Sequence, residues 1–232
     1  MLLRLQDGKN YLIDCGDGAV TSLIRRGVDA ASLDAVFVTH IHDDHVGGIV
    51  GVLKMAAKYR RLFPEKHTQF LLPEVEAVHA LEGWVAAIRS PYQERQCGIY
   101  GYMPGEIYNE NGVTVTAWAT NHNPPGKSCA LAFQFSGKSI VFTGDLAGDF
   151  HDFPHAQINA LPQPPDAVVC ELTHYSPEKA MPIMASLKTR RVIFTHVHDP
   201  WDLPEHRRQL ADWCAELPYP VQIAEDNTEW QF

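Results

Sequence analysis

Four potential metal ligands stand within six residues of one another in this chain: His40, His42, Asp44 and His45. Three imidazoles and a carboxylate at this density exceed what one closed structural zinc needs from a local segment. They suit two cations side by side, each keeping an open coordination position. The alternative is a polar, solvated loop with histidines by chance. We favour metal binding, because an HxHxDH string directly after a strand is far more specific than an isolated histidine pair.

The segment before these ligands predicts how they are positioned. Residues 35–38 are apolar and mostly β-branched or aromatic, which is typical of a buried strand. Strand side chains alternate between faces, so His40 and His42 can point the same way as the chain leaves the sheet. We expect Asp44 and His45 in the following turn, before a Gly-Gly pair lets the backbone bend into a helix.

Three later residues could complete such a site. Each follows a segment typical of a strand: His122 after residues 113–120, Asp145 after residues 139–143 and His196 after residues 191–195. A lone loop histidine is ordinarily an exposed bystander, and an aspartate after a strand can cap a helix. A carboxylate, however, can bridge two cations with its two oxygens, which imidazole cannot do.

The string and the order of the later motifs resemble the metallo-β-lactamase-fold hydrolase superfamily, in its ribonuclease Z and phosphodiesterase-like branch. The resemblance covers residues 2–224 and implies an α/β (α+β) fold, a four-layer αβ/βα sandwich. It has two departures. The strand and glycine-rich turn that usually come first in the family are missing. A single hairpin separates His122 from Asp145, which leaves no room for the tRNA-gripping arm of ribonuclease Z.

The resemblance also implies two divalent metal ions, with zinc as the first choice and manganese or iron as alternatives. It implies seven ligands: His40, His42 and His122 on one cation, Asp44, His45 and His196 on the other, and Asp145 bridging. His198 lies two residues after the last of these and is the alternative to His196. None of the five cysteines lies in a CxxC pair, so we expect no thiolate zinc site.

Three residues are our candidates for catalysis: Asp44, Glu171 and His174. Glu171 and His174 resemble the acidic segment that follows the bridging aspartate in ribonuclease Z, and either could pass a proton to the leaving group. The alternative is a capped helix start with an exposed histidine. Asp14, in an Asp-Cys-Gly turn, resembles a family aspartate that supports the metal ligands from behind. It could also simply cap the next helix.

Composition narrows the class of protein. The chain has 232 residues, 45% of them hydrophobic and 20% charged, which fits one globular hydrolase domain spanning residues 1–232. A net charge of −9 without a basic run argues against extended binding of structured nucleic acid. We expect no membrane segment and no signal peptide. Five scattered cysteines indicate reduced thiols in a cytoplasmic protein.

Hydrophobic periodicity predicts the other elements. We expect strands at residues 2–5, 10–14, 69–72, 128–135, 166–170 and 221–224, and helices at 17–26, 49–63, 73–85, 177–187 and 205–217. Residues 90–108 show no clear period and contain four tyrosines, so we expect an irregular loop. These tyrosines could line a substrate pocket or pack in the core.

The expected reaction is hydrolysis by metal-bound hydroxide, of a phosphodiester or another small ester. A small-molecule substrate is consistent with the net negative charge of the chain, which repels long polyanions. An ester, lactone or thioester hydrolase is the alternative within the same chemistry. An iron-dependent oxidoreductase on this scaffold and a binding protein with a vestigial site are alternatives from other classes. A homodimer is left open.

Overall fold

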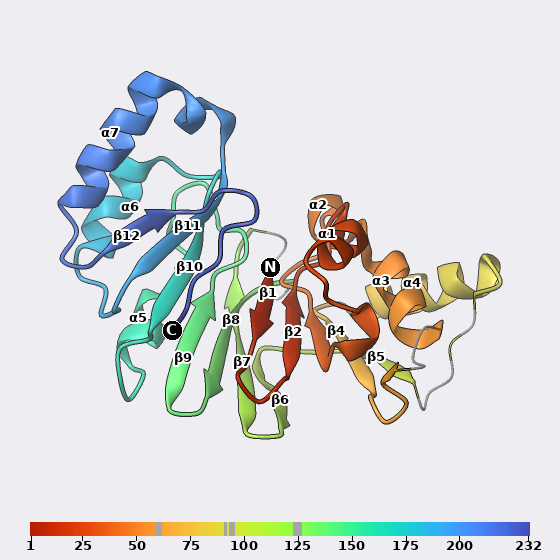
Figure 1. The fold of residues 1–232 in the computed structure, drawn as a ribbon. Helices are drawn as coiled ribbons and strands as arrows, with labels where there is room; N and C mark the ends of the chain where they lie inside the picture. Colours follow the sequence, from red (N-terminus) through yellow and green to blue (C-terminus); the bar gives the residue numbers. More distant parts are fainter. Residues whose placement is uncertain (59–61, 91, 93–95, 123–126) are drawn as a thin grey trace. The chain divides into compact units, whose positions relative to one another are not determined.

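The computed structural model describes the whole chain apart from residues 59–61, 91, 93–95 and 123–126, and the side chains of Asp199 and Asp202. It forms two compact units, Met1–Met103 and Pro104–Phe232, each built on its own sheet (Figure 1). Helices accompany both sheets. The expectation of one hydrolase domain over residues 1–232 stays a prediction.

The first unit contains a five-stranded sheet. Its strands follow chain order: β1 (Leu2–Arg4), β2 (Asn10–Ile13), β3 (Ala35–Phe37), β4 (Thr68–Leu72) and β5 (Cys97–Gly101). Only the β1–β2 pair is antiparallel, and the other pairs are parallel. The connecting helices are α1 (Ala19–Arg25), a 3-10 turn (Ala30–Ser32), α2 (Asp43–Val46), α3 (Ile49–Lys58) and α4 (Val75–Ala87).

Helix α3 shows why this unit packs as it does. Its apolar residues recur at spacings of three and four, so they share one face of the helix. That face, which includes Val52, Leu53 and Ala56, is buried against Val36 of β3 and Phe70 of β4. Helix α3 therefore covers part of the parallel sheet with apolar side chains, as parallel sheets require.

The second unit contains a seven-stranded sheet. Its order is β12 (Val221–Ile223), β11 (Val192–Val197), β10 (Ala167–Leu172), β9 (Lys138–Phe142), β8 (Ser128–Phe135), β7 (Val113–Thr120) and β6 (Gly105–Glu110). From β6 to β9 the pairs are antiparallel, and from β9 to β12 they are parallel. The helices are α5 (His155–Asn159), α6 (Pro177–Met184), a 3-10 turn (Asp199–Asp202) and α7 (Pro204–Ala215).

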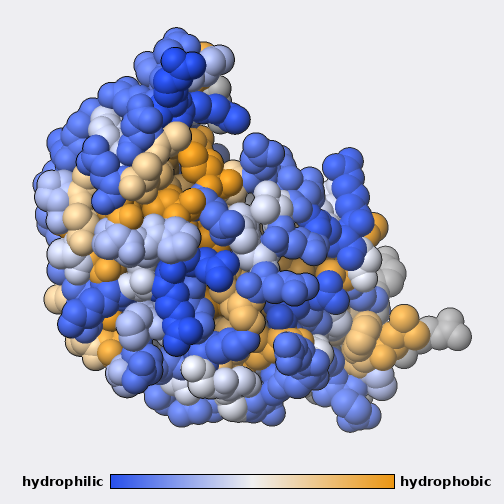
Figure 2. All heavy atoms as spheres, turned by 60° about the vertical axis from the view of Figure 1, so that its left-hand side comes forward, coloured by the Kyte–Doolittle hydropathy of each residue, from blue (hydrophilic) through white to orange (hydrophobic). Residues whose placement is uncertain are grey.

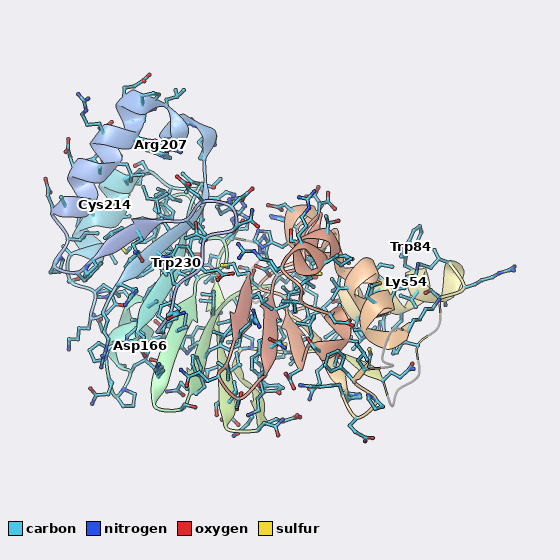
Figure 3. The ribbon with its side chains drawn as sticks, viewed as in Figure 1. Lys54, Trp84, Asp166, Arg207, Cys214 and Trp230 are labelled. Atoms are coloured by element: carbon cyan, nitrogen blue, oxygen red, sulfur yellow. The ribbon has the colours of Figure 1, made fainter. Side chains whose placement is uncertain are left out.

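Strand direction places the candidate ligands of the second unit at one edge of its sheet. Strands β9, β10 and β11 are parallel, and β7 runs the same way because two antiparallel pairings separate it from β9. Their carboxyl ends therefore lie together, which is where open α/β sheets bind ligands. Asp166, at the start of β10, marks the opposite edge (Figure 3).

Several sequence-based expectations were wrong in detail. Asp44 and His45 lie in a short helix, α2, and not in a turn. Residues 90–108 are not a loop throughout, because they contain β5 and the start of β6. Short glycine-containing strands carry too few side chains to show an alternating pattern. The expected end of the third helix near residue 63 falls beside residues 59–61, outside the described part of the chain.

The tyrosines of this segment do not share one role. Tyr102 and Tyr108 are buried, and the Tyr102 hydroxyl donates a hydrogen bond to the Val38 carbonyl at 2.6 Å. Tyr100 is exposed. For Tyr102 and Tyr108 the core reading is correct and the pocket-wall reading is wrong.

The described helices include none that is both long enough and apolar enough to span a bilayer. The longest in the first unit, α4, has 13 residues and presents Trp84 outward (Figure 3).

Candidate metal centre

In the first unit, Asp14 anchors the ligand-rich segment. Its carboxylate accepts hydrogen bonds from the Thr39 backbone N–H at 2.8 Å, from the Thr39 hydroxyl at 3.0 Å, and from Nδ1 of His45 at 2.8 Å. Asp14 itself has a positive φ of 57°, an uncommon conformation for a residue other than glycine. Strands β2 and β3 are parallel neighbours, so their carboxyl ends lie at the same edge of the sheet. The turn after β2 can therefore hold the segment after β3 through these hydrogen bonds.

Two glycines make this close packing possible. A Cβ atom at Gly16 would lie 1.9 Å from the carbonyl oxygen of Asp44, and one at Gly48 would lie 2.3 Å from that of Gly16. The backbone N–H of Cys15 donates to the His45 carbonyl at 2.7 Å. A side chain at either glycine would push the two segments apart and displace the ligands they carry.

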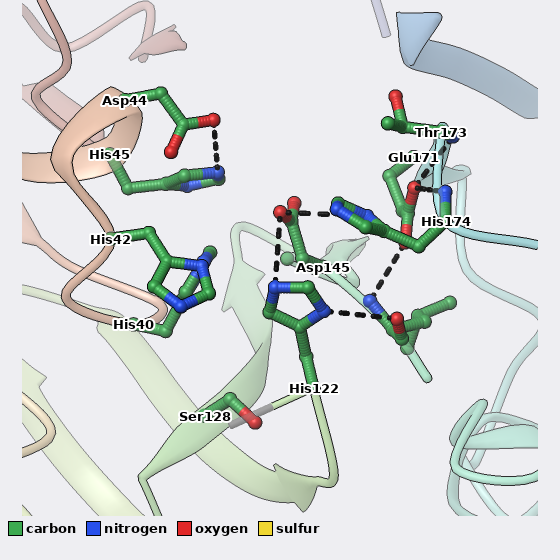
Figure 4. Close-up of polar contacts among 12 residues, drawn as sticks. His40, His42, Asp44, His45, His122, Ser128, Asp145, Glu171, Thr173 and His174 are labelled. Carbon is green, nitrogen blue, oxygen red and sulfur yellow. Dashed lines mark hydrogen bonds and ion pairs between the residues drawn. The ribbon is translucent and has the colours of Figure 1, made fainter. Parts of the chain in front are cut away.

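These contacts also set the imidazole tautomers of the first unit. Nδ1 of His45 donates to Asp14, so its Nε2 carries the lone pair and lies 3.5 Å from Oδ2 of Asp44. The Thr39 hydroxyl donates its hydrogen bond to Asp14. Nδ1 of His40 therefore donates a hydrogen bond to that hydroxyl oxygen at 3.2 Å. Nε2 of His40 then faces Nδ1 of His42 at 3.0 Å (Figure 4). Unprotonated ring nitrogens of this kind are what a divalent cation needs.

In the second unit, Asp145 lies among three imidazoles. Its carboxylate is only 3% exposed, and its Oδ2 lies 3.7 Å from Nε2 of His122, 3.7 Å from Nδ1 of His174 and 4.0 Å from Nε2 of His196. Two ligands of one tetrahedral zinc lie about 3.3 Å apart, given bonds of about 2.0–2.1 Å. The spacing around Asp145 is therefore close to that of ligands sharing an ion, and His122, Asp145 and His174 form one candidate metal group (Figure 4).

Backbone and hydroxyl contacts aim two of these rings at Asp145. Nδ1 of His122 donates to the Leu146 carbonyl at 3.1 Å, which leaves the lone pair on Nε2. The Thr173 hydroxyl donates to the His196 carbonyl, so Nδ1 of His196 donates back to that hydroxyl at 2.6 Å. Both rings therefore present an unprotonated Nε2, as metal-ligating histidines do.

His196 lies within β11 and not after it. It is the extra residue of a β-bulge, since Glu171 pairs with Thr195 and Leu172 pairs with Val197. Its φ of 49° is unusual for a side-chain-bearing residue and turns the ring toward Asp145. His198 is exposed at the start of the following 3-10 turn. The described contacts thus favour His196 over His198.

Glu171 holds the remaining imidazole. Its side chain is 2% exposed, and it accepts hydrogen bonds from the backbone N–H groups of Leu146, Thr173 and His174 at 2.7–3.0 Å. It also accepts one from Nδ1 of His174 at 3.0 Å. Because that nitrogen donates to Glu171, the Nε2 of His174 is the atom left for chemistry.

Sequence reasoning missed some of the residues that shape the site. Thr39 and Thr173 fix ring tautomers, and Asp152 joins two ligand loops. Thr39 stands next to His40 and could have signalled its contact, but Thr173 lies 23 residues from His196, and Asp152 lies in a stretch with no pattern. Its partners are revealed only by the folded chain.

Exposed residues border the second unit's ligands. Asp149 accepts a hydrogen bond from Nδ1 of His151, which raises the pKa of His151 and lowers the pKa of Asp149. Nε2 of His151 contacts Nδ2 of Asn121 at 3.0 Å. Nε2 of His155 contacts the Ser186 hydroxyl at 2.9 Å.

A pocket of about 390 Å³ lies elsewhere in the second unit. It is lined by Val197, Trp201, Arg207, Leu210, Ile223, Ala224, Glu225 and Asp226. Figure 2 shows hydrophobic and hydrophilic residues side by side on the face that it presents. No candidate metal ligand lines this pocket, so we locate the chemistry at the ligand clusters.

Comparison with known families decides where the chain belongs. A family model described as anti-Pycsar protein Apyc1 matches residues 1–163, which include the HxHxDH string, His122 and Asp145. The chain belongs to this family.

More distant relatives agree on the fold. Ribonuclease Z of Mycolicibacterium paratuberculosis is 24% identical over 82% of this chain and 76% of its own length. The metallo-β-lactamase-fold protein YhfI from Bacillus subtilis is 18% identical, with a TM-score of 0.75 over 97% of this chain and 88% of that one. A diphosphatase from the PhnP family is 21% identical, with a TM-score of 0.69 over 98% of this chain and 82% of that one.

These findings confirm the expected fold class and superfamily: the Apyc1-family chain has the mixed α/β metallo-β-lactamase fold and is similar to ribonuclease Z. Together with the clustered histidines and aspartates, they support a metal-dependent hydrolase that uses divalent cations.

Proposed function

We propose that this protein is a dinuclear metal-dependent phosphodiesterase acting on small or flexible phosphodiesters. The observation that carries the proposal is the buried Asp145 carboxylate, whose Oδ2 lies 3.7 Å from Nε2 of His122 and 4.0 Å from Nε2 of His196. A carboxylate beside imidazole nitrogens is a donor set that divalent cations such as zinc, manganese and iron accept. Bridging by Asp145 would give its negative charge to two cations at once.

The proposal assigns the cations the ligands that the sequence predicts. One would take His40, His42 and His122, the other Asp44, His45 and His196, and Asp145 would serve both. When bound, two such cations activate a water molecule and neutralise the charge that gathers on phosphoryl oxygens. Zinc, manganese and iron all suit imidazole and carboxylate donors.

Residues of the chain would do the remaining work. His174, held by Glu171 through Nδ1, presents Nε2 as the group that exchanges a proton with the leaving oxygen. Glu171 keeps the ring in one orientation. The side chain of Asp44 is more than half exposed, whereas that of Asp145 is buried.

The nature of the substrate follows from charge and topology. A net charge of −9 disfavours long polyanions at a distance. Strands β8 and β9 account for the described residues between His122 and Asp145, where an RNA-gripping arm would have to be inserted. Ribonuclease Z and PhnP-family diphosphatase among the relatives are consistent with phosphoryl chemistry. We propose a cyclic nucleotide or an aryl phosphodiester as the substrate class, in a cytoplasmic protein.

The test is a side-by-side assay of purified protein, stripped of metal and reloaded with zinc, manganese or iron(II). Substrates are an aryl phosphodiester, a cyclic nucleotide, a precursor tRNA, a lactone and a thioester. We expect metal-dependent turnover of the first two. Specific tRNA processing would contradict the proposal, and activity confined to the lactone or thioester would favour the alternative ester hydrolase. Oxygen consumption with a single iron per chain would favour the oxidoreductase.

A further inference from the structure

Two ligand-bearing loops of the second unit share one carboxylate. Oδ2 of Asp152 accepts a hydrogen bond from the backbone N–H of Asn121 at 2.6 Å, and its Oδ1 accepts one from the backbone N–H of Ala147 at 3.0 Å. Asn121 immediately precedes His122, and Ala147 comes two residues after Asp145. Asp152 therefore joins the loop after β7 to the loop after β9, next to a candidate ligand in each.

The peptide between these contacts is fixed on both sides. The Leu146 N–H donates to Glu171 at 2.8 Å, and the Leu146 carbonyl accepts from Nδ1 of His122 at 3.1 Å. The next N–H, of Ala147, goes to Asp152. Displacing Asp152 would thus loosen the carbonyl that orients His122.

Asp152 is itself held on a rigid support. Phe150 and Phe153 flank it in sequence, are 0% and 6% exposed, and stack with ring centroids 4.7 Å apart. Phe150 also packs on Tyr175 at 4.3 Å. Its φ of 63° is a genuine outlier for a bulky residue. Such strain persists only where the surroundings fix the conformation, and it is concentrated at functional sites.

We propose that Asp152 is a positioning residue that sets the separation of His122 and Asp145 and so tunes the affinity of these two residues for the cation that they would share. The assignment rests on the proposed function for the presence of a metal, but not on the identity of the substrate. Removing a contact that supports a metal ligand typically weakens metal affinity by about 10- to 100-fold, and we expect a change of this size here.

The test compares three variants with the wild-type chain. Asp152→Ala removes both acceptors, and Asp152→Asn keeps one acceptor oxygen. Asp166→Asn is the matched control: Asp166 accepts the Ser139 backbone N–H at 2.9 Å at the opposite edge of the same sheet. Each protein is stripped of metal, its thermal unfolding midpoint is recorded, and its zinc dissociation constant is measured by competition with a chelating dye.

We expect Asp152→Ala to weaken zinc binding by about 10- to 100-fold and Asp152→Asn by less. Asp166→Asn should lower the unfolding midpoint of the metal-free protein while leaving zinc affinity within about twofold of wild type. Equal zinc affinity in Asp152→Asn, Asp166→Asn and wild type would overturn the proposal. If Asp152→Ala fails to fold, Asp152→Asn decides. Wild-type protein that binds zinc but cleaves no phosphodiester would refute the proposed function and leave this test intact.

Discussion

Nδ1 of His174 donates a hydrogen bond to Oε1 of Glu171 over 3.0 Å, and the same nitrogen lies 3.7 Å from Oδ2 of Asp145. One imidazole therefore faces two buried carboxylates, and its Nδ1–H donates a hydrogen bond to Glu171. Glu171 is saturated by further backbone donors, whereas Asp145 is surrounded by imidazoles. Glu171 therefore positions the His174 ring, and Asp145 is the carboxylate that we propose as a cation ligand.

Replacing His174 should slow turnover in a way that depends on the leaving group. We expect His174→Ala to reduce kcat by about 10²- to 10⁴-fold on a cyclic nucleotide, whose alkoxide needs a proton. The loss should be much smaller on an aryl phosphodiester with an acidic phenol. His155→Ala, which changes a histidine bonded to Ser186, is the control. Equal losses on both substrates would show that His174 is not the proton donor.

Removing the proposed bridging carboxylate should cost more metal than removing a nearby exposed imidazole. We expect Asp145→Ala to retain clearly less zinc than His198→Ala after dialysis, because a bridging carboxylate serves both cations. Metal content per chain by plasma emission spectrometry measures the difference. Equal retention in the two variants would contradict the bridging assignment.

Asp44→Asn should keep the fold and abolish most turnover. Asp44 is more than half exposed, so the amide adds no packing strain, but a neutral amide binds a divalent cation more weakly than a carboxylate does, so one cation is held less tightly. Circular dichroism checks the fold, and kcat measured together with the metal content per chain checks the activity. Near-normal activity at full metal occupancy would show that Asp44 is not a ligand.

The cysteines should be unreactive in the native chain. Burial raises the pKa of Cys15 and of Cys170 to about 12 and that of Cys214 to about 11. At pH 8 almost no thiolate is present, and thiolate is the reactive form. We expect iodoacetamide to leave the native protein nearly unmodified and to label all five thiols after unfolding, by intact mass. On raising the pH, Cys214 should react first, and rapid native labelling of Cys15 would contradict its burial.

The sequence by itself determined the fold class and predicted a set of metal ligands. An HxHxDH string after an apolar run can be recognised because ligand spacing and strand pattern are local properties of the chain. The family match over residues 1–163 and the structural neighbours bear out the superfamily that these motifs indicated.

Only the tertiary structure decided how the ligands are aimed. Whether His45 binds through Nε2 depends on Asp14, 31 residues away in sequence, and His196 depends on Thr173 and on a bulge in β11. Strands β5 and β6 escaped detection because their pairing partners, and not their own side chains, make them strands. Asp152 is a further example, because its two carboxylate oxygens accept hydrogen bonds from two loops that come together only in the folded chain. Contacts between distant segments produce no periodic pattern in the sequence, because they depend on how several segments pack together.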